Sequence, residues 1–544
     1  IVKSNVKWGI IEIWQGDKSL YIPTINNDKT GIYLKKDSTI NIYVKPKDAD
    51  EVTKIVVNGT EYTNLNIDSN GFYYATLPIT KSPQKINITI DEYIRYEDIV
   101  QPYPVLLRFK DENGNEVSWG GKFKVGSTIA RIGSFNDCNL LKGIYTVSNA
   151  KLNGSPLPST PHVVEKSMVF TCTATWAFDN NEPKCILSPR LLRIPNSSYK
   201  ILGYIPDISG HGNHGKINNS AYEGMSGVNG YPVVFGKNKT WANESNGYVT
   251  NITSNTIHIT NVLNGGLALL YSYVKYNGNL QNIKEIPPFK IEIKGLEGMS
   301  KFIYKYLATS DATKETNLYL GNGTHELPKS FLPTEALITN AVVGFSISPI
   351  EEGVTNFLSD ITIKVLPEYE GAYCLDGVDD FVTIPTLSRG GKQVLMKVNW
   401  QKSPTLLYDQ RASGSFAVLT TLEDDAVNPR IAYQACNQDG KTYIDGIENN
   451  YIETYTLKDI THNITIANSS SGGVIVPVIG CNTGKTSSFA QMSLYDFMLF
   501  DNVSTDDKIK QLNEYVGIEG NVWGTLTQLS NSTLISNETL IKNE

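Results

Sequence analysis

Residues 373–385 read Tyr-Cys-Leu-Asp-Gly-Val-Asp-Asp-Phe-Val-Thr-Ile-Pro, and this stretch decides the fold class. Apolar residues recur at every second position on both sides of Asp376-Gly377, which is typical of a hairpin of two strands joined by a tight turn. Elsewhere the chain repeats short alternating runs separated by Asn-Gly turns, such as Asn58-Gly59 and Asn113-Gly114. We therefore predict an all-β, multidomain protein.

A glycine-rich stretch and a closing strand and helix accompany this segment. Residues 207–215, Asp-Ile-Ser-Gly-His-Gly-Asn-His-Gly, hold three glycines in nine positions and predict a tight loop. Residues 493–501 are a largely apolar strand, and residues 504–516 follow with the pattern of a short helix. We expect Ser504 and Asp507 to form the N-capping pair of this helix. Its buried face is predicted to hold Ile509, Leu512 and Val516.

Taken in order, the loop, residues 375–385 and residues 494–516 resemble the laminin G-like, concanavalin A-like lectin/glucanase jelly roll. Members of that family carry a D-x-S-G-x-G-N-H-G loop and an F-D-G-V-D-D-Y-V-x-I-P hairpin, and they end on a strand and a capped D-x-x-I helix. In ordinary members a few tens of residues separate the first two motifs, whereas about 160 separate them here. We interpret the excess as an inserted β-sandwich, with its own alternating runs and Asn-Gly turns.

The rest of the chain supplies further β modules. The order V-V-N-G-T, G-F-Y-Y-A-T-L-P, I-N-I-T-I near the N-terminus resembles immunoglobulin-like (Ig-like) modules of bacterial and phage surface proteins, which usually serve as spacers. The C-terminal tail fits either a partner-docking strand or a disordered segment. The predicted units are an Ig-like β-sandwich (1–98), a small β module (99–172), a discontinuous jelly roll (173–247 and 368–519), an inserted β-sandwich (248–367) and a tail (520–544).

Composition excludes several classes of function. The 544 residues include 48 Lys and Arg against 55 Asp and Glu, a formal net charge of −7. A polybasic nucleic-acid binder is therefore excluded. No apolar run approaches the roughly 18 residues of a membrane helix, so we expect no membrane insertion. Because the first residue is Ile1, we expect a processed chain or part of a longer one.

The six cysteines are scattered without a C-x-x-C pair. This spacing favours small buried thiols over zinc or redox chemistry. One bridge, for example between Cys172 and Cys185, is left open.

Three patterns suggest chemistry on first inspection. Retaining hydrolases of this jelly roll use an E-x-D-x-x-E strand, but after Glu423 and Asp425 the third position is Asn428. Residues 480–486, Gly-Cys-Asn-Thr-Gly-Lys-Thr, are one residue short of a Walker loop and lack a following helix, so we predict a turn. His211 and His214 lack further nearby ligands and are interpreted as loop residues. No catalytic residue is predicted.

Calcium is the one cofactor that the resemblance implies. Relatives of this jelly roll often bind Ca²⁺, which takes several hard oxygen ligands, and Asp376, Asp379 and Asp380 are the candidates here. Asp376 is also the residue that an Asp-Gly turn requires, so a purely structural role stays open. Trp176, Trp241 and Trp400 suit either a sugar-stacking surface or a core.

Jelly rolls with a sandwich inserted at this point are similar to large proteins of Bacteroidales gut bacteria and of their phages, where many are virion fibre or head-decoration components. The resemblance implies a non-enzymatic bacteriophage structural protein (a tail or head fibre, spike or capsid decoration) on the virion surface that adheres to a host surface glycan. Other virion proteins and a homo-oligomer, a trimer by analogy, are the expected partners. The alternative is a bacterial cell-surface or extracellular glycan-binding adhesin, and the third hypothesis is a polysaccharide-degrading enzyme.

Overall fold

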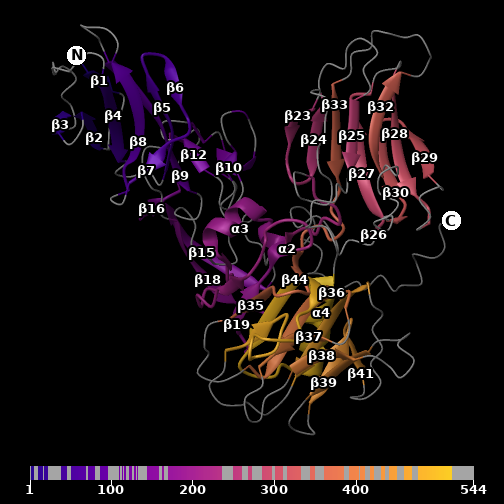
Figure 1. Ribbon diagram of the computed structural model, residues 1–544. Coiled ribbons are helices and arrows are strands. Elements are labelled where there is room, and N and C mark those ends of the chain that lie inside the picture. The colour runs from indigo at the N-terminus through magenta and orange to yellow at the C-terminus, as the bar shows by residue number, and fades with distance from the viewer. Residues whose placement is uncertain are drawn as a thin grey trace.

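The architecture is that of a computed structural model. It describes residues 2–4, 10–15, 18–21, 38–45, 51–68, 71–79, 86–95, 109–110, 113, 116–117, 122–124, 128–129, 131–132, 144–152, 154–157, 162–163, 170–235, 249–259, 268–272, 285–296, 300–309, 315–331, 343–349, 360–384, 391–402, 405–410, 417–421, 430–434, 440–449, 459–467 and 476–517. Across these residues antiparallel strands dominate, and the helices are short. The prediction of an all-β, multidomain protein is confirmed. Figure 1 shows the strands gathered into three main groups.

The first sandwich, drawn in indigo in Figure 1, is made of two sheets that share one core. One sheet contains β1 (Val2–Ser4), β9 (Ile86–Arg95), β5 (Glu51–Val57) and β6 (Thr60–Tyr62), with β12 (Lys122–Lys124) also paired to β9. The other contains β3 (Lys18–Tyr21), β2 (Ile10–Gln15), β4 (Ser38–Lys45), β8 (Tyr73–Ile79) and β7 (Asn66–Ile67). The turn predicted at Asn58-Gly59 joins β5 to β6, and both residues have the positive φ that such a hairpin needs. Because β12 belongs to this sheet, the sandwich extends beyond residue 98.

Short strands connect this sandwich to the next one. Small sheets pair β10 (Phe109–Lys110) with β11 (Glu116–Val117) and β14 (Arg131–Ile132), and β13 (Thr128–Ile129) with β17 (His162–Val163). A three-stranded sheet holds β16 (Ser155–Pro156), β15 (Tyr145–Leu152) and β18 (Phe170–Trp176). Tyr145 and Leu152 of β15 are buried in the largest core of the protein. These strands therefore pack on the central sandwich, across the boundary expected at residue 172.

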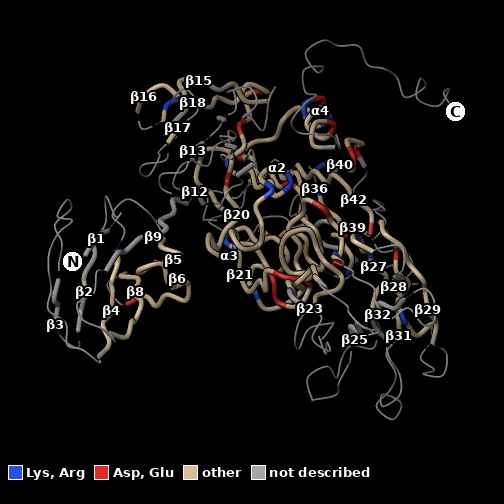
Figure 2. Tube along the Cα trace, turned by 90° about the horizontal axis from the view of Figure 1, so that it is seen from above, with Lys and Arg blue, Asp and Glu red and all other residues tan. Residues whose placement is uncertain are grey.

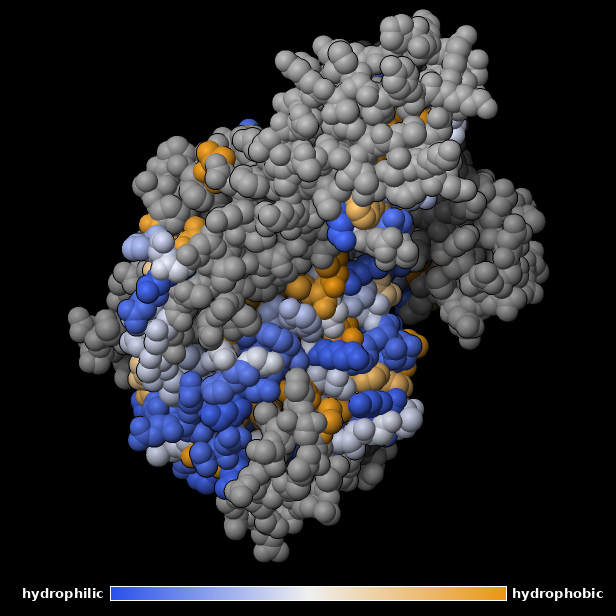
Figure 3. All heavy atoms as spheres, turned by 90° about the vertical axis from the view of Figure 1, so that its left-hand side faces the viewer, coloured by the Kyte–Doolittle hydropathy of each residue, from blue (hydrophilic) through white to orange (hydrophobic). Residues whose placement is uncertain are grey.

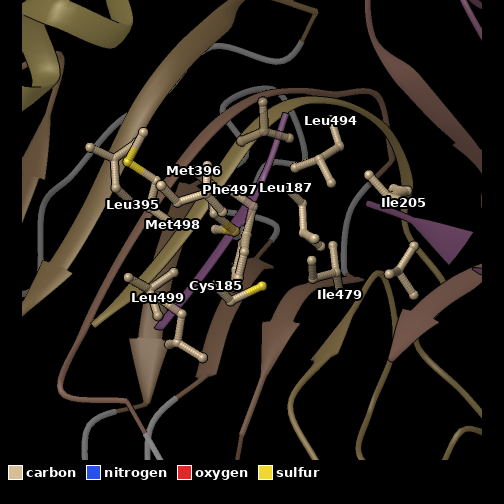
Figure 4. Close-up of a cluster of buried hydrophobic side chains, with 14 of the residues drawn as sticks. Cys185, Leu187, Ile205, Leu395, Met396, Ile479, Leu494, Phe497, Met498 and Leu499 are labelled. Carbon is tan, nitrogen blue, oxygen red and sulfur yellow. The ribbon is translucent and has the colours of Figure 1, made fainter. Parts of the chain in front are cut away.

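The central sandwich is built from two separated parts of the sequence, which Figure 1 shows as magenta strands beside orange and yellow ones. Its larger sheet runs β22 (Gly227–Val228), β34 (Tyr373–Asp376), β44 (Gln491–Phe500), β36 (Gln393–Trp400), β42 (Thr461–Ala467), β40 (Lys441–Ile444), β41 (Ile447–Asn449), with β19 (Pro183–Leu187) also paired to β44. The second sheet runs β20 (Tyr204–Ile205), β21 (Gly215–Asn218), β35 (Phe381–Thr383), β43 (Val478–Ile479), β37 (Thr405–Asp409), β38 (Ala417–Thr421), β39 (Arg430–Gln434). The two sheets share one core (Figure 4), where Phe497 of the first and Ile479 of the second are both fully buried.

The turn at Asp376-Gly377 does not close a hairpin, and the predicted pairing of its two strands is wrong. β34 pairs with β22 and β44 in one sheet, whereas β35 pairs with β21 and β43 in the other. The turn therefore crosses from one sheet to the facing sheet. Alternation could not reveal this, because both strands direct apolar side chains into the same core. A Cβ on Gly377, whose φ is +77°, would lie 2.8 Å from Cβ of Gln491, so glycine is required.

The inserted sandwich lies in sequence between the two parts of the central sandwich. One sheet runs β23 (Val249–Ile252), β24 (Thr256–Ile259), β33 (Ile361–Val365), β27 (Phe289–Lys294), β30 (Gly323–Leu327), and the other runs β25 (Ala268–Ser272), β32 (Val343–Pro349), β28 (Ser300–Leu307), β29 (Glu315–Leu320). A small third sheet pairs β26 (Glu285–Ile286) with β31 (Ser330–Phe331). Val233 and Phe235 belong to the core of this sandwich, so its packing begins before residue 248.

Three helices lie among the described residues: α2 (Pro189–Leu192), α3 (Asn196–Leu202) and α4 (Asp506–Gly517). In α4 the predicted face is confirmed, because Ile509, Leu512 and Val516 are each buried. The predicted cap is displaced by one residue. The helix starts after Thr505, whose Oγ1 accepts a hydrogen bond from the Lys508 amide, while Ser504 Oγ instead accepts one from Asn181 Nδ2.

The described surface is polar and of mixed charge. Figure 2 shows acidic and basic residues interspersed along the chain, and the described part of the face in Figure 3 is largely hydrophilic with scattered hydrophobic spots. No helix in the described ranges combines the length and apolar character needed to cross a membrane.

The glycine-rich loop between β20 and β21 is organised by the buried carboxylate of Asp207. Its Oδ1 accepts hydrogen bonds from the backbone amides of Ile186 and Ser209, both at 2.8 Å. Its Oδ2 accepts one from the Asn213 amide at 2.8 Å and one from Ser209 Oγ at 2.9 Å. The predicted tight loop is confirmed, and one side chain joins it to β19.

We expect Asp207→Ala to lower the stability of the central sandwich by about 3 kcal/mol or more, because four donors around a buried site lose a charged acceptor. Thermal unfolding followed by circular dichroism measures the effect. Glu370→Ala is the matched control, since Glu370 is an exposed acid of the segment that leads into β34. A loss no larger than that of the control would show that the carboxylate does not hold the loop.

Candidate functional site

Three carboxylates gather where β34 passes into β35. Asp376, Asp379 and Asp380 each offer a carboxylate oxygen, and these oxygens lie within 4.8 Å of one another. Asp380 is buried, with 1% of its surface exposed, Asp376 is half-buried and Asp379 is exposed. The structure thus brings together all three residues that the sequence analysis proposed as calcium ligands.

Hydrogen bonds fix the backbone of this turn. Asp376 Oδ1 accepts from the Val378 amide at 2.8 Å, and Asp380 Oδ2 accepts from the Asp376 amide at 3.2 Å. Asn219 Nδ2 donates to the Asp379 carbonyl at 3.0 Å, which ties the turn to the segment after β21. The structural role considered for Asp376 is therefore present, and it engages one of its two carboxylate oxygens.

Asp380 is the electrostatically unusual member of the group. Its Oδ1 is buried and has no hydrogen-bond partner within bonding distance. Burial raises the pKa of Asp380 to about 6, the Ser226 hydroxyl opposes that shift, and the charges of Asp376 and Asp379 add to it. A buried carboxylate oxygen without a donor, flanked by two further carboxylates, is an environment that a bound cation would stabilise.

Hydroxyl groups line one side of the carboxylates. The Tyr373 hydroxyl donates to Ser220 Oγ at 2.8 Å, Ser220 Oγ lies 3.1 Å from Ser226 Oγ, and Ser226 Oγ accepts from the Ala221 amide at 2.7 Å. Tyr222 has a φ of +57°, which is uncommon for a bulky residue. Burial, followed by the charge of Asp380, raises the pKa of its hydroxyl.

The sequence analysis did not single out Ser220, Tyr222, Ser226 or Asn219. They follow β21 and precede the inserted sandwich, and they reach the carboxylates through the pairing of β21 with β35. That contact joins residues about 160 apart in the chain, and no local pattern signals it.

The other catalytic and nucleotide patterns remain structural or lie outside the described residues. Glu423, Asp425 and Trp241 are outside the described ranges. Residues 480–486 form the turn predicted for them, in which Asn482 Oδ1 accepts from the Thr486 amide at 3.0 Å, and the strand β44 follows.

The two loop histidines occupy different environments. His214 Nδ1 accepts a hydrogen bond from the Asp207 amide at 3.0 Å, its ring stacks on Tyr204, and burial lowers its pKa. His211 lies 3.2 Å from Ser209 Oγ and 3.4 Å from Lys184 Nζ. Across the described part of the chain, the group of three or more metal-ligating side chains is the aspartate group alone. The geometry therefore favours loop roles for both histidines.

The tryptophans and cysteines of the central sandwich serve its packing. Trp400 is fully buried, and Trp176 is half-buried against Tyr145 and Phe500. Cys185 is a free, buried thiol, so the bridge left open between Cys172 and Cys185 is not formed. Its Sγ donates instead to the Asn213 carbonyl at 3.1 Å.

We predict that calcium raises the melting temperature of the protein by several degrees, because a ligand that binds the folded state stabilises it. Asp380→Asn should lose most of this increase, and magnesium should give a smaller one, since it demands a tighter octahedral set of ligands. Differential scanning calorimetry with calcium and with EGTA measures both effects. Glu370→Gln is the matched control and should respond as the wild type does. Identical melting of the wild type under the two conditions would contradict the prediction.

Asp380 also predicts a pH dependence in EGTA. The raised pKa means that the folded state binds this proton more tightly than the unfolded chain does. The stability it contributes is complete below about pH 4 and is lost as the pH rises through about 6, by at most about 3 kcal/mol. Asp380→Asn removes this loss, so the difference in melting temperature between the variant and the wild type should rise from about pH 4 to about pH 7. A constant difference would show that Asp380 titrates as it does in the unfolded chain.

Comparison with known proteins adds little to this geometry. No protein-family model matches the chain, and no curated protein matches it. Among solved structures, Trypanosoma rangeli sialidase aligns at 10% identity over 88% of this chain and 92% of its own, with a TM-score of 0.18. The Bacteroides ovatus mixed-linkage glucan utilization locus SGBP-B, in complex with a mixed-linkage heptasaccharide, aligns at 10% identity over 67% of this chain and 94% of its own, with a TM-score of 0.09. Scores this low carry no argument about what this chain binds.

Proposed function

We propose that the chain is a non-enzymatic carbohydrate-binding protein, with a calcium-dependent glycan site at residues 376–380. The observation that carries the proposal is the buried, unpartnered Oδ1 of Asp380 inside a group of three carboxylates. Calcium takes six to eight oxygen ligands. Three side chains on one turn leave several of these positions for water or for the neighbouring hydroxyls of a sugar.

The surroundings of the carboxylates suit a sugar. Asp379 and Val378 are exposed at the tip of the turn, and Val378 has 70% of its surface exposed. Tyr222 and Asn219 lie beside the turn and offer an aromatic ring and an amide. A site of this kind supports weak binding by one copy, and several copies on one particle would raise the avidity.

As the finer proposal, the protein is a structural component of a bacteriophage virion, a tail or head fibre, spike or capsid decoration, that assembles as a homo-oligomer and adheres to a host glycan. The resemblance of residues 207–215, 375–385 and 494–516 to lectin-like jelly rolls with an insertion supports it. The runner-up is a bacterial cell-surface adhesin built from the same modules. Mass spectrometry of purified virions separates the two, because the protein would be absent from virions if it were an adhesin of the bacterium.

The binding proposal predicts calcium-dependent recognition on an array of bacterial capsular and surface glycans. Wild-type protein should bind at least one glycan in calcium and lose at least about ten-fold in affinity in EGTA, a change of about 1.4 kcal/mol. Asp380→Asn should reproduce that loss in calcium, and Glu370→Gln should not. Binding that EGTA and Asp380→Asn leave unchanged would contradict the site. Release of reducing ends from a bound polysaccharide would instead support the hypothesis of a degrading enzyme.

A further inference from the structure

One sheet of the first sandwich has an outer face, whose side chains point away from the core. In β4, the side chains of Ile40, Ile42 and Val44 are buried in the core of the sandwich. Alternation therefore directs Asn41, Tyr43 and Lys45 to the opposite face, and burial agrees, since Asn41 and Tyr43 are half-buried and Lys45 is exposed. This face belongs to the sheet β3-β2-β4-β8-β7 at one side of the sandwich (Figure 1).

Two tyrosines stand side by side on this face. Tyr43 of β4 is directly opposite Tyr74 of β8 in the register, and their ring centroids are 4.9 Å apart with an angle of 32° between the planes. Asn66 of the edge strand β7 is opposite Tyr74 on its other side and is exposed. The rings therefore form a continuous strip across neighbouring strands, which we call the tyrosine strip.

Polar groups flank the tyrosine strip. In the adjacent row of the sheet, Thr76 Oγ1 donates to Asn41 Oδ1 at 2.7 Å, and this bond orients the Asn41 amide. Its Nδ2 group keeps two donors for a ligand. On the other side of Asn41, Trp14 of β2 is its partner in the strand register.

The row on the other side of the strip contains Phe72 and Lys45. Phe72 meets Tyr43 edge to face, with centroids 6.3 Å apart and an interplanar angle of 82°. Lys45 Nζ lies over the Phe72 ring at 5.4 Å. The cation of this row is thus engaged with a ring of the protein. On β2, Glu12 is directly opposite Tyr43 in the register, so the strip is followed by an acidic position.

These features select one class of occupant. A stable protein interface buries about 800 Å² on each partner, whereas the strip offers two rings bordered by amide and hydroxyl groups. A nucleic acid requires a concentration of basic groups to neutralise its phosphates. A pyranose ring presents an apolar C–H face that can stack on an aromatic ring and hydroxyls at its edge that can bond to Asn41, Asn66 and Thr76. Because the rings and amides extend over neighbouring strands, an extended chain of sugars can contact more of them than a single sugar can.

We propose that the tyrosine strip and its flanking amides bind a neutral polysaccharide chain, which makes the first sandwich a second glycan-binding module in place of the spacer expected from its sequence. This site lies on a different sandwich from the carboxylates of residues 376–380 and uses no cation. It therefore stands independently of the calcium-dependent site.

Affinity gel electrophoresis of the full chain in EGTA tests the proposal. The gels contain one of four soluble neutral polysaccharides: hydroxyethyl cellulose, arabinoxylan, galactomannan or dextran. Wild-type protein should be retarded by at least one of them, and Tyr74→Ala should weaken that retardation about ten-fold, as the loss of one stacking platform predicts. Tyr74→Phe keeps the ring and should stay within about three-fold of the wild type.

Matched controls separate binding from folding and from the other site. Tyr319→Ala removes an exposed tyrosine of the inserted sandwich and should leave the retardation unchanged, as should Asp380→Asn. The Tyr74→Ala protein should keep the circular dichroism spectrum of the wild type. Wild-type protein unretarded in all four gels, or retardation that Tyr74→Ala does not weaken, overturns the tyrosine strip. In that case, glycan binding that requires calcium and is abolished by Asp380→Asn would still be observed for the wild type. Failure of the tyrosine strip can therefore be distinguished from failure of the calcium-dependent site.

Discussion

The central sandwich depends on the antiparallel pairing of β19 with β44, which joins strands about 310 residues apart in the chain. A buried ion pair accompanies it. Asp496 of β44 is 1% exposed and accepts hydrogen bonds from Arg190 Nε at 2.8 Å and from Ser188 Oγ. A buried carboxylate is costly unless its partners are in place, so this contact penalises any register of β19 that separates them. Asp207 extends the constraint, because it binds the Ile186 amide of β19 and the loop before β21.

A contact so distant in sequence must overcome the entropy of closing a long loop, which rises only with the logarithm of loop length. The inserted sandwich lowers this entropy cost further, because it has its own core and because backbone hydrogen bonds join the two segments that connect it to the central sandwich. The Glu368 amide donates to the Gly230 carbonyl, the Tyr369 amide to the Asn229 carbonyl, and the Asn229 amide to the Ala372 carbonyl. Once the inserted sandwich is folded, the chain therefore enters and leaves it at neighbouring positions. The two halves of the central sandwich then meet as if a short connection joined them.

The features that could be predicted from the sequence are those that local patterns encode. Asp376, Asp379 and Asp380 lie together because five consecutive residues form one turn, and Ile509, Leu512 and Val516 share a face through helical periodicity. The pairing of β34 and β35 with different sheets was not predictable, because alternation reports which side of a strand faces a core and does not identify its neighbours. For the same reason, the position of Ser226 beside Asp380 and the position of Tyr43 beside Tyr74 could not be predicted from the sequence. The cap at Thr505 was not predicted, because Ser504 Oγ accepts a hydrogen bond from Asn181 Nδ2, a residue far away in the sequence.

The two proposed glycan surfaces rest on different physics and should respond differently to their surroundings. At the carboxylate turn a cation competes with protons, since Asp380, with its pKa raised to about 6, becomes protonated as the medium acidifies and calcium requires the ionised form. Stacking on Tyr43 and Tyr74 involves no proton and no cation, so it is insensitive to both. When one glycan reaches two weak sites on the same chain, the second binding step is intramolecular and the overall affinity exceeds that of either site. A chain with both surfaces would hold a glycan most tightly in neutral, calcium-containing surroundings, and in acid it would keep the part of that affinity that the tyrosines supply.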